Sequence, residues 1–570
     1  MSDTNSPTIG YIVGGGLQAN LQVRLTVPAD QLQEGGFVVI ESGDWVYCGL
    51  VTDLMLGATN PRFADEQSEQ RLPESLAQLL HGQTLFTNLV VLPALMMARI
   101  PDIGTPEYEP WRKAHPDDSE LQPLPVKTVP AHHAPVRRAQ EEDVSRIFGG
   151  PDKPSSFVIG KTREGDLPIR IDLAKFVQRS AGIFGATGTG KSFLTRIILA
   201  GLIKYDAASV LVFDMHNEYG LDDIASDTSK PVTGLKSKFG SKVQVVALGS
   251  GSQIRGKTPD AHLTIAYSDI STVDIEMLTR ELNLKETTAT TLDALYQSFH
   301  QDWFQSFMTM DLGTTVEDEA TGKKVPAPGS VEHWAMTNGV NVMAAQGLYS
   351  KLRRVFDKPY LVPQCPAGSS LDVILQYLER KSHVVLSFGK YESDLDYLLV
   401  TNILTRRIRE KWEGMVNAFR SQGEKEPRPL VIAVEEAHKI LNREMASQTT
   451  FSTIAREMRK YYVTLLIIDQ RPSQIDDEVM SQLGTRISGW LGDDSDIAAV
   501  LSGLAGKDAL RGMLSRLQPK EEVLALGWGV PMPILVRSRR YDDVFWKELL
   551  GDGGKDSSSK GDWGDRLGMG

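Results

Sequence analysis

The sequence predicts an α/β protein in which a small β-barrel precedes a domain built on a parallel sheet. In the first hundred residues, short stretches of alternating apolar and polar side chains are separated by Gly, Asp and Asn turns, as in a small barrel. From about residue 150, nearly continuous apolar stretches alternate with helical patterns, as in a parallel sheet buried on both faces. We therefore expect residues 1–150 to hold the barrel and a linker, and residues 151–540 to hold the α/β domain.

The elements of the barrel region are expected where the apolar alternation is clearest. The candidate strands are Leu21–Val27, Phe37–Ile40, Trp45–Thr52 and Leu85–Leu92. Residues 101–135 are rich in proline and charge, which indicates a connection with little regular structure. The stretch Glu141–Gly149 is expected to be a short helix that leads into the next domain.

The α/β domain contains five further apolar strand candidates. They are Ser209–Phe213, Val243–Leu248, His383–Phe388, Leu430–Val434 and Val463–Ile468. Residues 272–380 are expected to form a helical insertion with a polar break at Gly313–Gly329, and Glu521–Val536 resembles a β-hairpin. Residues 541–570 form a C-terminal tail that we expect to be disordered from residue 551, because few apolar residues remain there.

Composition limits the kinds of protein that this chain can be. It has 570 residues, two distant cysteines, Cys48 and Cys365, and a net charge of −12. The cysteines have no metal-ligand spacing and favour a reducing compartment. The chain has neither an apolar stretch long enough to span a bilayer nor a signal-peptide pattern, so we expect a cytoplasmic protein without a membrane anchor. The acidic charge argues against a surface that grips nucleic acid everywhere, but it permits a narrow basic channel.

A phosphate-binding P-loop is the clearest motif of the chain. Its eight residues are Gly185, Ala186, Thr187, Gly188, Thr189, Gly190, Lys191 and Ser192. An apolar stretch precedes the motif and a helical pattern follows it, which is the context that a P-loop requires. We expect the backbone amides to hold the phosphates of ATP, Lys191 to reach the β- and γ-phosphates, and Ser192 to ligate Mg²⁺.

Two adjacent acids at the end of the strand Leu430–Val434 supply the second half of the predicted site. Glu435 is expected to hold Mg²⁺, and Glu436 to polarise the water that attacks the γ-phosphate. Such a pair is often only a solvated loop, but the intact P-loop favours catalysis. His438 is less informative, because a helix start explains it equally well.

Three more residues are candidates for sensing or stabilising the γ-phosphate. Gln470 follows the strand Val463–Ile468 and is placed to sense the phosphate. Arg456 and Arg459 lie near one predicted helix end, where basic residues are favourable for dipole reasons alone. The functional hypothesis is that one of them is an arginine finger that acts in the site of a neighbouring subunit.

The order of these motifs resembles that of the HerA family, in the FtsK–HerA group of ring-forming DNA-pumping ATPases. The resemblance covers about residues 8–540 and is carried by the motifs in the following order: the barrel, the P-loop, Asp214–Tyr219, Glu435–His438, Arg456–Lys460 and Gln470–Ser473. It implies a RecA-like core, a barrel of the type shared by HerA and ATP synthase subunits (a HAS barrel), and a homohexamer with ATP sites between subunits. It also implies double-stranded DNA in the central pore. A NurA-like nuclease, or a sirtuin-like or other effector, would dock on the barrel in DNA-end processing or antiphage defence.

The chain departs from the family pattern at two positions. Arg179 and Ser180 stand where related sequences often have a histidine, and Glu435 replaces the commoner Asp. Contact with DNA is the least defined property. The candidate pore-lining residues are Lys236, Lys238 and Lys242, and Lys351, Arg353 and Arg354, although basic clusters are usually solvated faces.

Three hypotheses for the function follow. The first is an ATP-driven translocase, or helicase, that moves double-stranded DNA as a hexamer. The second is an ATPase ring that scaffolds and regulates an effector enzyme with little DNA pumping, which the acidic net charge favours. A conjugation or secretion ATPase is less consistent with the absence of an apolar anchor in the sequence.

Overall fold

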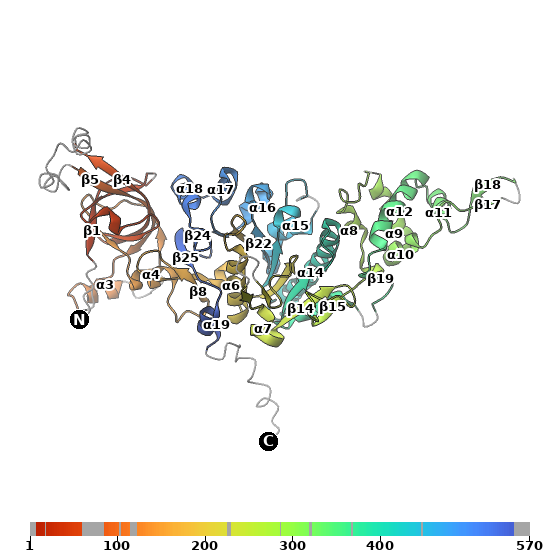
Figure 1. Ribbon diagram of the computed structural model, residues 1–570, viewed down its shortest axis with the longest axis horizontal. Coiled ribbons are helices and arrows are strands. Elements are labelled where there is room, and N and C mark those ends of the chain that lie inside the picture. Colours follow the sequence, from red (N-terminus) through yellow and green to blue (C-terminus); the bar gives the residue numbers. More distant parts are fainter. Residues whose placement is uncertain are drawn as a thin grey trace, which may run out of the picture. The chain divides into compact units, whose positions relative to one another are not determined.

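The computed structural model describes residues 7–551, except residue 18 and the ranges 60–84, 102–103, 115–121, 225–229, 286, 318–321, 366–368, 446–448 and 505. The described residues form two compact units. Figure 1 labels the helices and strands of both. The first takes in parts of Met1–Gly201, Gln470–Ser473 and Leu483–Arg540. The second takes in parts of Leu202–Asp469, Gln474–Gln482 and Tyr541–Gly570. The domain boundaries expected from the sequence stay a prediction.

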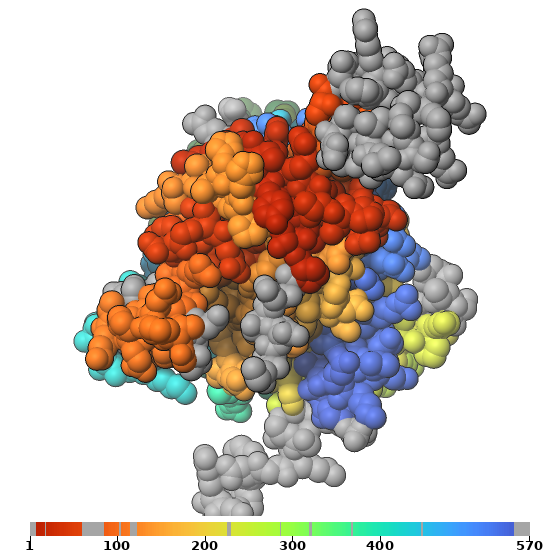
Figure 2. Space-filling model, turned by 90° about the vertical axis from the view of Figure 1, so that its left-hand side faces the viewer, coloured from red at the N-terminus to blue at the C-terminus, as the bar shows by residue number. Residues whose placement is uncertain are grey.

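The first unit begins with a closed β-barrel, which confirms the predicted barrel. Figure 2 shows the surface of this part of the chain in red to orange. Its strands are β1 (Thr8–Gly14), β2 (Leu21–Leu25), β3 (Phe37–Ser42), β4 (Trp45–Ala58), β5 (Leu85–Ala98) and β7 (Pro135–Arg138), with the short β6 (Leu124–Pro125) added beside β5. Pairing of β2 with β5 closes the ring, and closure removes the free sheet edges. Alternate side chains such as Val23, Val38 and Val91 fill the interior and are fully or almost fully buried.

The connection after the barrel is more ordered than the sequence indicated. Residues 101–135 contain the helix α3 (Tyr108–Ala114) and the strand β6. The predicted helix at residue 141 is α4 (Glu141–Phe148), where Asp143 accepts a hydrogen bond from the N–H of Gln140 at 2.8 Å. This carboxylate also pairs with Arg137 of β7, so the helix start is fixed to the barrel.

Ion pairs join the barrel to the rest of the first unit. The Glu34 carboxylate, in the loop before β3, pairs with Arg516, and the Glu34 carbonyl accepts a bond from Arg163 at 2.9 Å. Arg163 also forms a bidentate pair with Glu522, which is 5% exposed. Because these contacts combine charge with fixed geometry, they hold the barrel in place more firmly than exposed single pairs do.

The sheet of the first unit carries the P-loop. Its strands, in spatial order, are β10 (Ala181–Phe184), β23 (Thr485–Ser488), β24 (Glu522–Gly527), β25 (Ile534–Ser538), β8 (Ser156–Lys161) and β9 (Pro168–Asp172). The pair β10 and β23 is parallel, whereas the other pairs are antiparallel. The helices α17 (Asp494–Val500) and α18 (Lys507–Arg516) belong to the same unit. The hairpin β24–β25 agrees with the prediction for residues 521–536.

The second unit contains a wholly parallel set of strands. In spatial order they are β15 (Ala261–Leu263), β14 (Val243–Leu248), β20 (His383–Ser387), β11 (Ser209–Asp214), β21 (Leu430–Glu435) and β22 (Val463–Asp469). Almost every residue of β11, β20, β21 and β22 is buried, as the apolar stretches predicted. The α/β fold class, with a RecA-like P-loop core behind a barrel, is therefore confirmed.

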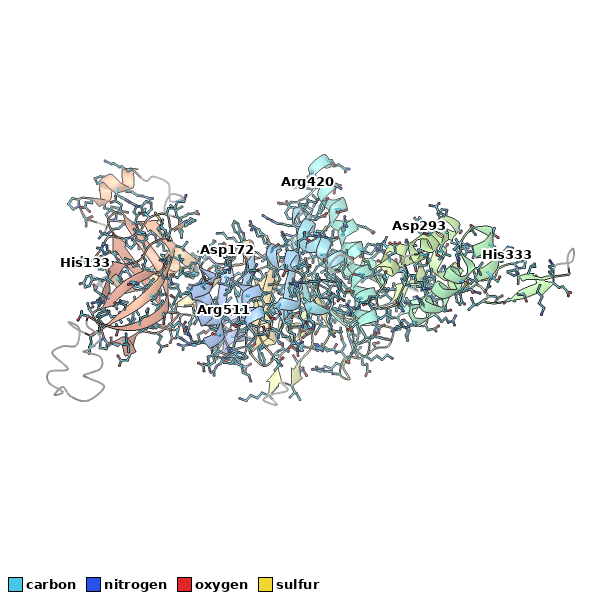
Figure 3. The ribbon with its side chains drawn as sticks, turned by 90° about the horizontal axis from the view of Figure 1, so that it is seen from above. His133, Asp172, Asp293, His333, Arg420 and Arg511 are labelled. Atoms are coloured by element: carbon cyan, nitrogen blue, oxygen red, sulfur yellow. The ribbon has the colours of Figure 1, made fainter. Side chains whose placement is uncertain are left out.

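The predicted helical insertion is also present, in the second unit. It comprises α8 (Thr272–Glu276), α9 (Thr288–Phe299), α10 (Trp303–Met308), α11 (Val331–Thr337), α12 (Val342–Phe356) and α13 (Ser370–Glu379). Asp293 on α9 and His333 on α11 mark it in Figure 3. The expected polar break is a hairpin of β17 (Thr315–Glu317) and β18 (Lys324–Pro326), whose turn falls outside the described residues.

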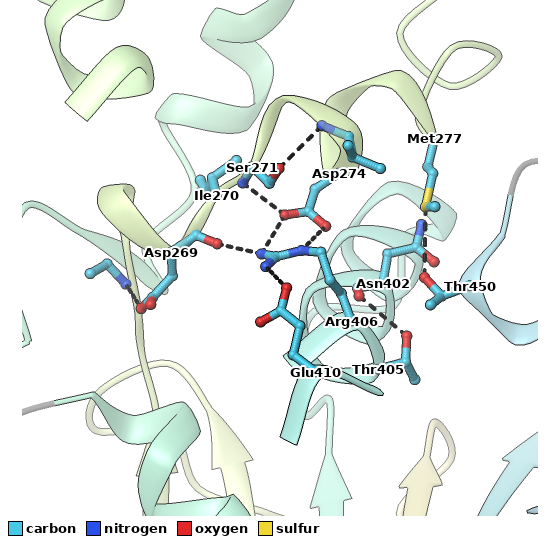
Figure 4. A network of polar contacts seen from close by, with 12 residues as sticks. Asp269, Ile270, Ser271, Asp274, Met277, Asn402, Thr405, Arg406, Glu410 and Thr450 are labelled. Atoms are coloured by element: carbon cyan, nitrogen blue, oxygen red, sulfur yellow. Dashed lines mark hydrogen bonds and ion pairs between the residues drawn. The ribbon is translucent and has the colours of Figure 1, made fainter. Parts of the chain in front are cut away.

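A buried ion pair fastens the insertion to the long helix α14 (Asp394–Gln422). Arg406 of α14 donates to both oxygens of Asp274 on α8, at 3.0 and 2.8 Å, and to the Asp269 carbonyl at 2.7 Å (Figure 4). Glu410, one turn further along α14, accepts a hydrogen bond from the remaining nitrogen of the guanidinium, Nη1. Burial raises the pKa of Asp274, and the Arg406 hydrogen bonds oppose this effect. The pair thus depends on its geometry to offset desolvation.

The C-terminal tail begins with a helix, α19 (Asp543–Leu550), whose Trp546 stacks edge-on against Phe239 at a centroid distance of 5.8 Å. The predicted disorder from residue 551 concerns a stretch that lies, apart from residue 551, outside the described residues. No helix within the described ranges has both the length and the apolar character needed to cross a bilayer.

Candidate functional site

The P-loop adopts the strand–loop–helix geometry that its sequence predicts. It connects β10 to α6 (Lys191–Lys204), and its three glycines Gly185, Gly188 and Gly190 all have positive φ, at 153°, 79° and 91°. Side chains with a Cβ rarely adopt this backbone, so the loop requires glycine there. The Lys191 ammonium donates to the Gly185 carbonyl at 3.1 Å. The lysine therefore lies folded over the loop whose amides would hold phosphate.

Backbone contacts fix the P-loop from the segment after β23 and from the loop before β24. The N–H of Ala186 donates to the Trp490 carbonyl at 3.0 Å, and the N–H of Lys520 donates to the Thr189 carbonyl at 3.1 Å. The Thr189 hydroxyl closes the loop by donating to the Ala186 carbonyl at 2.7 Å. The loop is preorganised, so little ordering entropy is lost when an anion binds.

The structure brings Gln470 to the P-loop, as its proposed sensing role requires. The Thr187 hydroxyl donates to Oε1 of Gln470 at 2.5 Å. The two residues are 283 positions apart in the sequence, and both belong to the first unit. This contact places a neutral amide next to the phosphate-binding amides.

The second unit holds a cluster of buried acids at the carboxyl ends of two neighbouring strands. Strands β11 and β21 are parallel, with Phe213 opposite Val434, so Asp214 and Glu435 follow next to each other. They are 1% and 5% exposed. The Tyr219 hydroxyl donates to Oε1 of Glu435 at 2.7 Å.

Asp214 orients Tyr219 by capping the turn between them. Its two carboxylate oxygens accept the backbone N–H groups of Glu218, at 2.8 Å, and of Tyr219, at 3.0 Å. Such an Asx-type turn is a local structure that a short acidic side chain favours. The sequence pattern Asp214–Tyr219 therefore has a physical function: it fixes a phenol over the Glu435 carboxylate.

Burial makes the acids of this cluster reluctant to ionise. Desolvation is the main reason why the pKa of Glu435 lies well above its ordinary value, and the charges of Asp214 and Glu218 raise it further. The Tyr219 hydrogen bond opposes this shift. Burial also raises the pKa of Asp214, while the backbone amides that it accepts lower it.

The chemistry of Glu435 fits a magnesium ion. Its second oxygen, Oε2, is buried and has no hydrogen-bond partner among the described residues. An orphan carboxylate oxygen is costly unless it meets a cation or water. No group of three or more His, Cys, Asp or Glu side chains in the described ranges could enclose a metal by itself. Magnesium does not need such a cage, because it uses one or two carboxylates together with nucleotide phosphates.

Glu436 lies in a strained turn that a neighbouring strand supports. Its backbone is left-handed, with φ 47° and ψ 45°, which is unusual for a residue other than Gly, Asn or Asp. The next turn is held by Asp469 at the end of β22. The fully buried Asp469 carboxylate accepts the N–H of His438 at 2.7 Å and lies 3.0 Å from its ring Nδ1.

Asp469 also changes the protonation of His438. The hydrogen bond that the His438 ring forms with the Asp469 carboxylate is the main reason why the pKa of His438 is raised, although burial opposes it. The charge of Glu436, whose Oε2 lies 3.5 Å from the ring, adds to the increase. Thus His438 is more than a helix-start residue: it sits between two acids. Sequence inspection did not identify Asp469, although its position directly before Gln470 was a signal.

The two candidate finger arginines differ in their surroundings. Arg456 lies on α15 (Thr450–Glu457), with its side chain 38% exposed and paired with Glu478 at 3.3 Å. Arg459 is exposed in the short 3-10 helix that follows. Both are accessible, and their action on a neighbouring subunit stays a prediction.

Most of the candidate pore-lining cations have partners in their own unit. Lys236 pairs with Asp260 and donates to the Val243 carbonyl, and Lys238 lies 5.4 Å from the centroid of the Trp546 ring. On α12, Lys351 and Arg354 donate to backbone carbonyls and Arg353 pairs with Asp357. These contacts favour the interpretation that both clusters are ordinary solvated faces and do not line a pore.

The chain is similar to known proteins over nearly its full length. The family model described as "Helicase HerA, central domain" matches residues 157–408. The DNA double-strand break repair helicase HerA of Sulfurisphaera tokodaii is 25% identical over 541 residues, which are 94% of this chain and 93% of that protein. The protein of the same description from Saccharolobus solfataricus is 23% identical over 569 residues, with 97% and 95% covered.

Among solved structures, VirB4 of Thermoanaerobacter pseudethanolicus resembles 70% of this chain and 99% of its own, with 16% identity and a TM-score of 0.43. The motifs, the fold and the near full-length similarity to HerA proteins agree. Residues 157–408 therefore match the HerA central-domain family, and the chain, which is similar to HerA proteins over nearly its full length, is an ATP-hydrolysing P-loop enzyme.

Proposed function

We propose that this protein is an ATP-dependent double-stranded DNA translocase that acts as a homohexameric ring. The observation that carries the proposal is the preorganised P-loop with Gln470 at hydrogen-bond distance, in a chain that also holds the buried Glu435 and, directly after it, the half-buried Glu436. The names of its relatives, DNA double-strand break repair helicases, favour DNA as the substrate.

In the proposed reaction, water attacks the γ-phosphorus of ATP, the bond to the β–γ bridging oxygen breaks, and ADP leaves. Lys191 binds the β- and γ-phosphates, and Glu436 accepts the proton of the attacking water. Ser192 and Glu435 would hold Mg²⁺, which neutralises phosphate charge when bound. Gln470 senses the γ-phosphate, and Arg456 or Arg459 stabilises the transition state in a neighbouring subunit.

Two substitutions test the hydrolysis mechanism. Lys191→Ala should abolish nucleotide binding or turnover, whereas Glu436→Gln should keep ATP binding and stop hydrolysis. Binding is measured with a fluorescent ATP analogue, and turnover by phosphate release. A Glu436→Gln protein that turned over ATP at a near-normal rate would remove Glu436 from the proposed role.

The DNA part of the proposal has its own test. Addition of double-stranded DNA should stimulate ATP hydrolysis, and the stimulation should fall steeply as salt rises, because phosphate contacts release counterions. Displacement of a triplex-forming strand by the advancing ring measures translocation directly. An ATPase rate that is indifferent to DNA at low salt would refute translocation.

A second candidate function is an ATPase ring that scaffolds an effector enzyme. The net charge of −12 and the local partners of Lys236, Lys351 and Arg354 favour it. In both cases we propose that a NurA-like nuclease, or a sirtuin-like or other effector, docks on the barrel during DNA-end processing or antiphage defence. The two candidates differ in their response to DNA: an ATPase rate that is indifferent to DNA, together with effector activity that depends on the ring, would support the scaffold.

A further inference from the structure

We propose that an exposed indole in a turn at the strand ends of the first unit's sheet is a docking surface for nucleic acid. Trp528, in the turn between β24 and β25, is 44% exposed, although it is one of the largest apolar side chains. Three polar residues surround it: Lys175, Gln178 and Arg179. We call these four residues the Trp528 platform.

The turn that carries Trp528 is rigid. Its backbone N–H donates to the Gly484 carbonyl at 2.6 Å, and the N–H of Gly529 donates to the Thr485 hydroxyl at 2.9 Å. The Gly529 carbonyl accepts the N–H of Asp172, the residue that caps α5 (Leu173–Phe176; Figure 3). A rigid exposed ring loses little conformational entropy when it binds a partner, which distinguishes it from a mobile surface side chain.

Two cations lie against the indole. The Arg179 guanidinium is 4.5 Å from the Trp528 ring centroid, and the Lys175 ammonium is 5.9 Å from it. The stem of Arg179 lies on Gly484, where an added Cβ would come within 2.6 Å of it. Gly484 therefore permits the stack. The indole N–H donates to Gln178 at 3.2 Å, so the orientation of the ring is fixed as well.

Neither cation of the Trp528 platform is neutralised within the described part of the chain. Lys175 and Arg179 have no carboxylate partner there, in contrast to neighbouring Lys153, which pairs with Asp172 at 2.6 Å. The chain as a whole is acidic, with a net charge of −12. Two unpaired cations beside a fixed aromatic ring therefore form a local positive site that is complementary to an anion.

The platform is separate from the P-loop. Gly527 lies opposite Thr485 in the β23–β24 pair, and Thr485 lies opposite Ala181, the first residue of β10. The P-loop begins after Phe184, at the other end of the same strand. Four residues of a strand span about 13 Å, so a ligand on the platform does not occupy the nucleotide site.

An aromatic face together with cations matches the chemistry of nucleic acid. A base stacks on the exposed part of the indole, and the backbone phosphates pair with Arg179 and Lys175. An acidic protein segment would use the two cations but would leave the indole unused. Stacking requires a base that is free of its neighbours, so the platform fits a single strand or an unpaired tail better than the inside of a duplex. The identification of the ligand as DNA rests on the proposed function.

Binding of labelled oligonucleotides to the full-length protein tests the platform. The oligonucleotide is offered as a single strand, as a blunt duplex and as a duplex with an unpaired tail. Trp528→Ala should weaken binding of the single strand and the tailed duplex by about 5- to 150-fold, which is the range of one lost base stack. Trp528→Phe should keep most of the affinity but lose the part of the intrinsic fluorescence that DNA quenches.

The cations are tested by salt dependence. Arg179→Gln and Lys175→Gln should each lower the slope of log affinity against log salt by about 0.7–0.9. The matched control is Arg540→Gln, which changes an exposed arginine of the same unit that lies outside the platform and should leave the affinity unchanged. Thermal unfolding and ATP binding of each variant establish that the fold is intact.

Three results would overturn the proposal. If Trp528→Ala binds every DNA form as tightly as the unaltered protein, the platform is not a DNA surface, although the proposed translocase function stands. If the unaltered protein binds no DNA of any form, the proposed function fails first. If a Glu-rich peptide competes with DNA for the platform as well as a single strand does, the surface binds an acidic protein instead.

Discussion

Removal of one hydroxyl from Tyr219 tests the electrostatics of the buried acids. Tyr219→Phe keeps a ring that is fully buried and deletes only the O–H that donates to Glu435 at 2.7 Å. The Glu435 carboxylate is 5% exposed, and its Oε2 already lacks a partner among the described residues. After the substitution, both oxygens lack the donors that an ionised carboxylate requires.

The expected size of the effect depends on pH. Hydrogen bonds to charged groups contribute about 1.5–3 kcal/mol, and those between neutral groups about 0.5–1.5 kcal/mol. The folded pKa of Glu435 is raised, so its contribution to stability is fully present below its unfolded pKa and is lost as pH rises through the folded pKa. Tyr219→Phe raises the folded pKa further, because the deleted bond lowered it. The loss of unfolding free energy should therefore grow from about 1 kcal/mol at acid pH to about 1.5–3 kcal/mol at alkaline pH.

Urea denaturation across this pH range, in metal-free buffer, measures the difference. The matched control is Tyr397→Phe, because the Tyr397 hydroxyl donates to the backbone carbonyl of Glu435, at 3.3 Å, and not to its carboxylate. That variant should lose little stability, with no growth of the loss toward alkaline pH. A second readout is the Mg²⁺ concentration for half-maximal ATP hydrolysis, which should rise by about 10-fold or more in Tyr219→Phe. A stability loss below about 0.5 kcal/mol at every pH, with unchanged Mg²⁺ dependence, would refute the reasoning.

Three further substitutions give separate predictions. His438→Gln should remove stability of about 1 kcal/mol at pH values below the ordinary histidine pKa, and the difference should vanish in urea titrations as pH rises through the raised pKa that Asp469 sustains. Asp274→Ala should lower the free energy of unfolding by about 1.5–3 kcal/mol in urea titrations, because it removes the buried carboxylate that accepts two hydrogen bonds from the half-buried Arg406 guanidinium. Mixtures of Arg459→Ala and Lys191→Ala subunits should recover part of the ATPase activity if the arginine acts in trans, and the absence of recovery at any mixing ratio would count against a finger.

The sequence predicts the elements of this site better than it predicts their partners. The P-loop spacing requires positive φ at glycines, and the structure has positive φ at Gly185, Gly188 and Gly190. The strands of the second unit could be predicted from their apolar stretches, because a parallel strand that is buried on both faces consists almost entirely of apolar residues. These features depend on residues that are close together in the chain, so they can be predicted from a single sequence.

Contacts across the sheet are the part that the sequence does not reveal. Tyr219 and Glu435 are 216 residues apart, and they meet because β11 lies beside β21. The spatial strand order β14, β20, β11, β21 differs from the chain order, and no periodicity specifies it. The left-handed backbone of Glu436 is likewise set by its surroundings, because its side chain type does not favour that conformation.

The end of β22 joins the proposed phosphate sensor, Gln470, to the residue that holds the turn after the proposed catalytic acid, Glu436. Asp469 holds the His438 turn, which follows Glu436 directly. The next residue, Gln470, accepts a hydrogen bond from Thr187 of the P-loop. One peptide bond joins these two residues, so under the proposed sensing role we expect a shift of the Gln470 backbone to displace Asp469 as well. Because Glu436 already occupies a strained backbone region, a small shift of its supporting turn changes its conformational energy substantially.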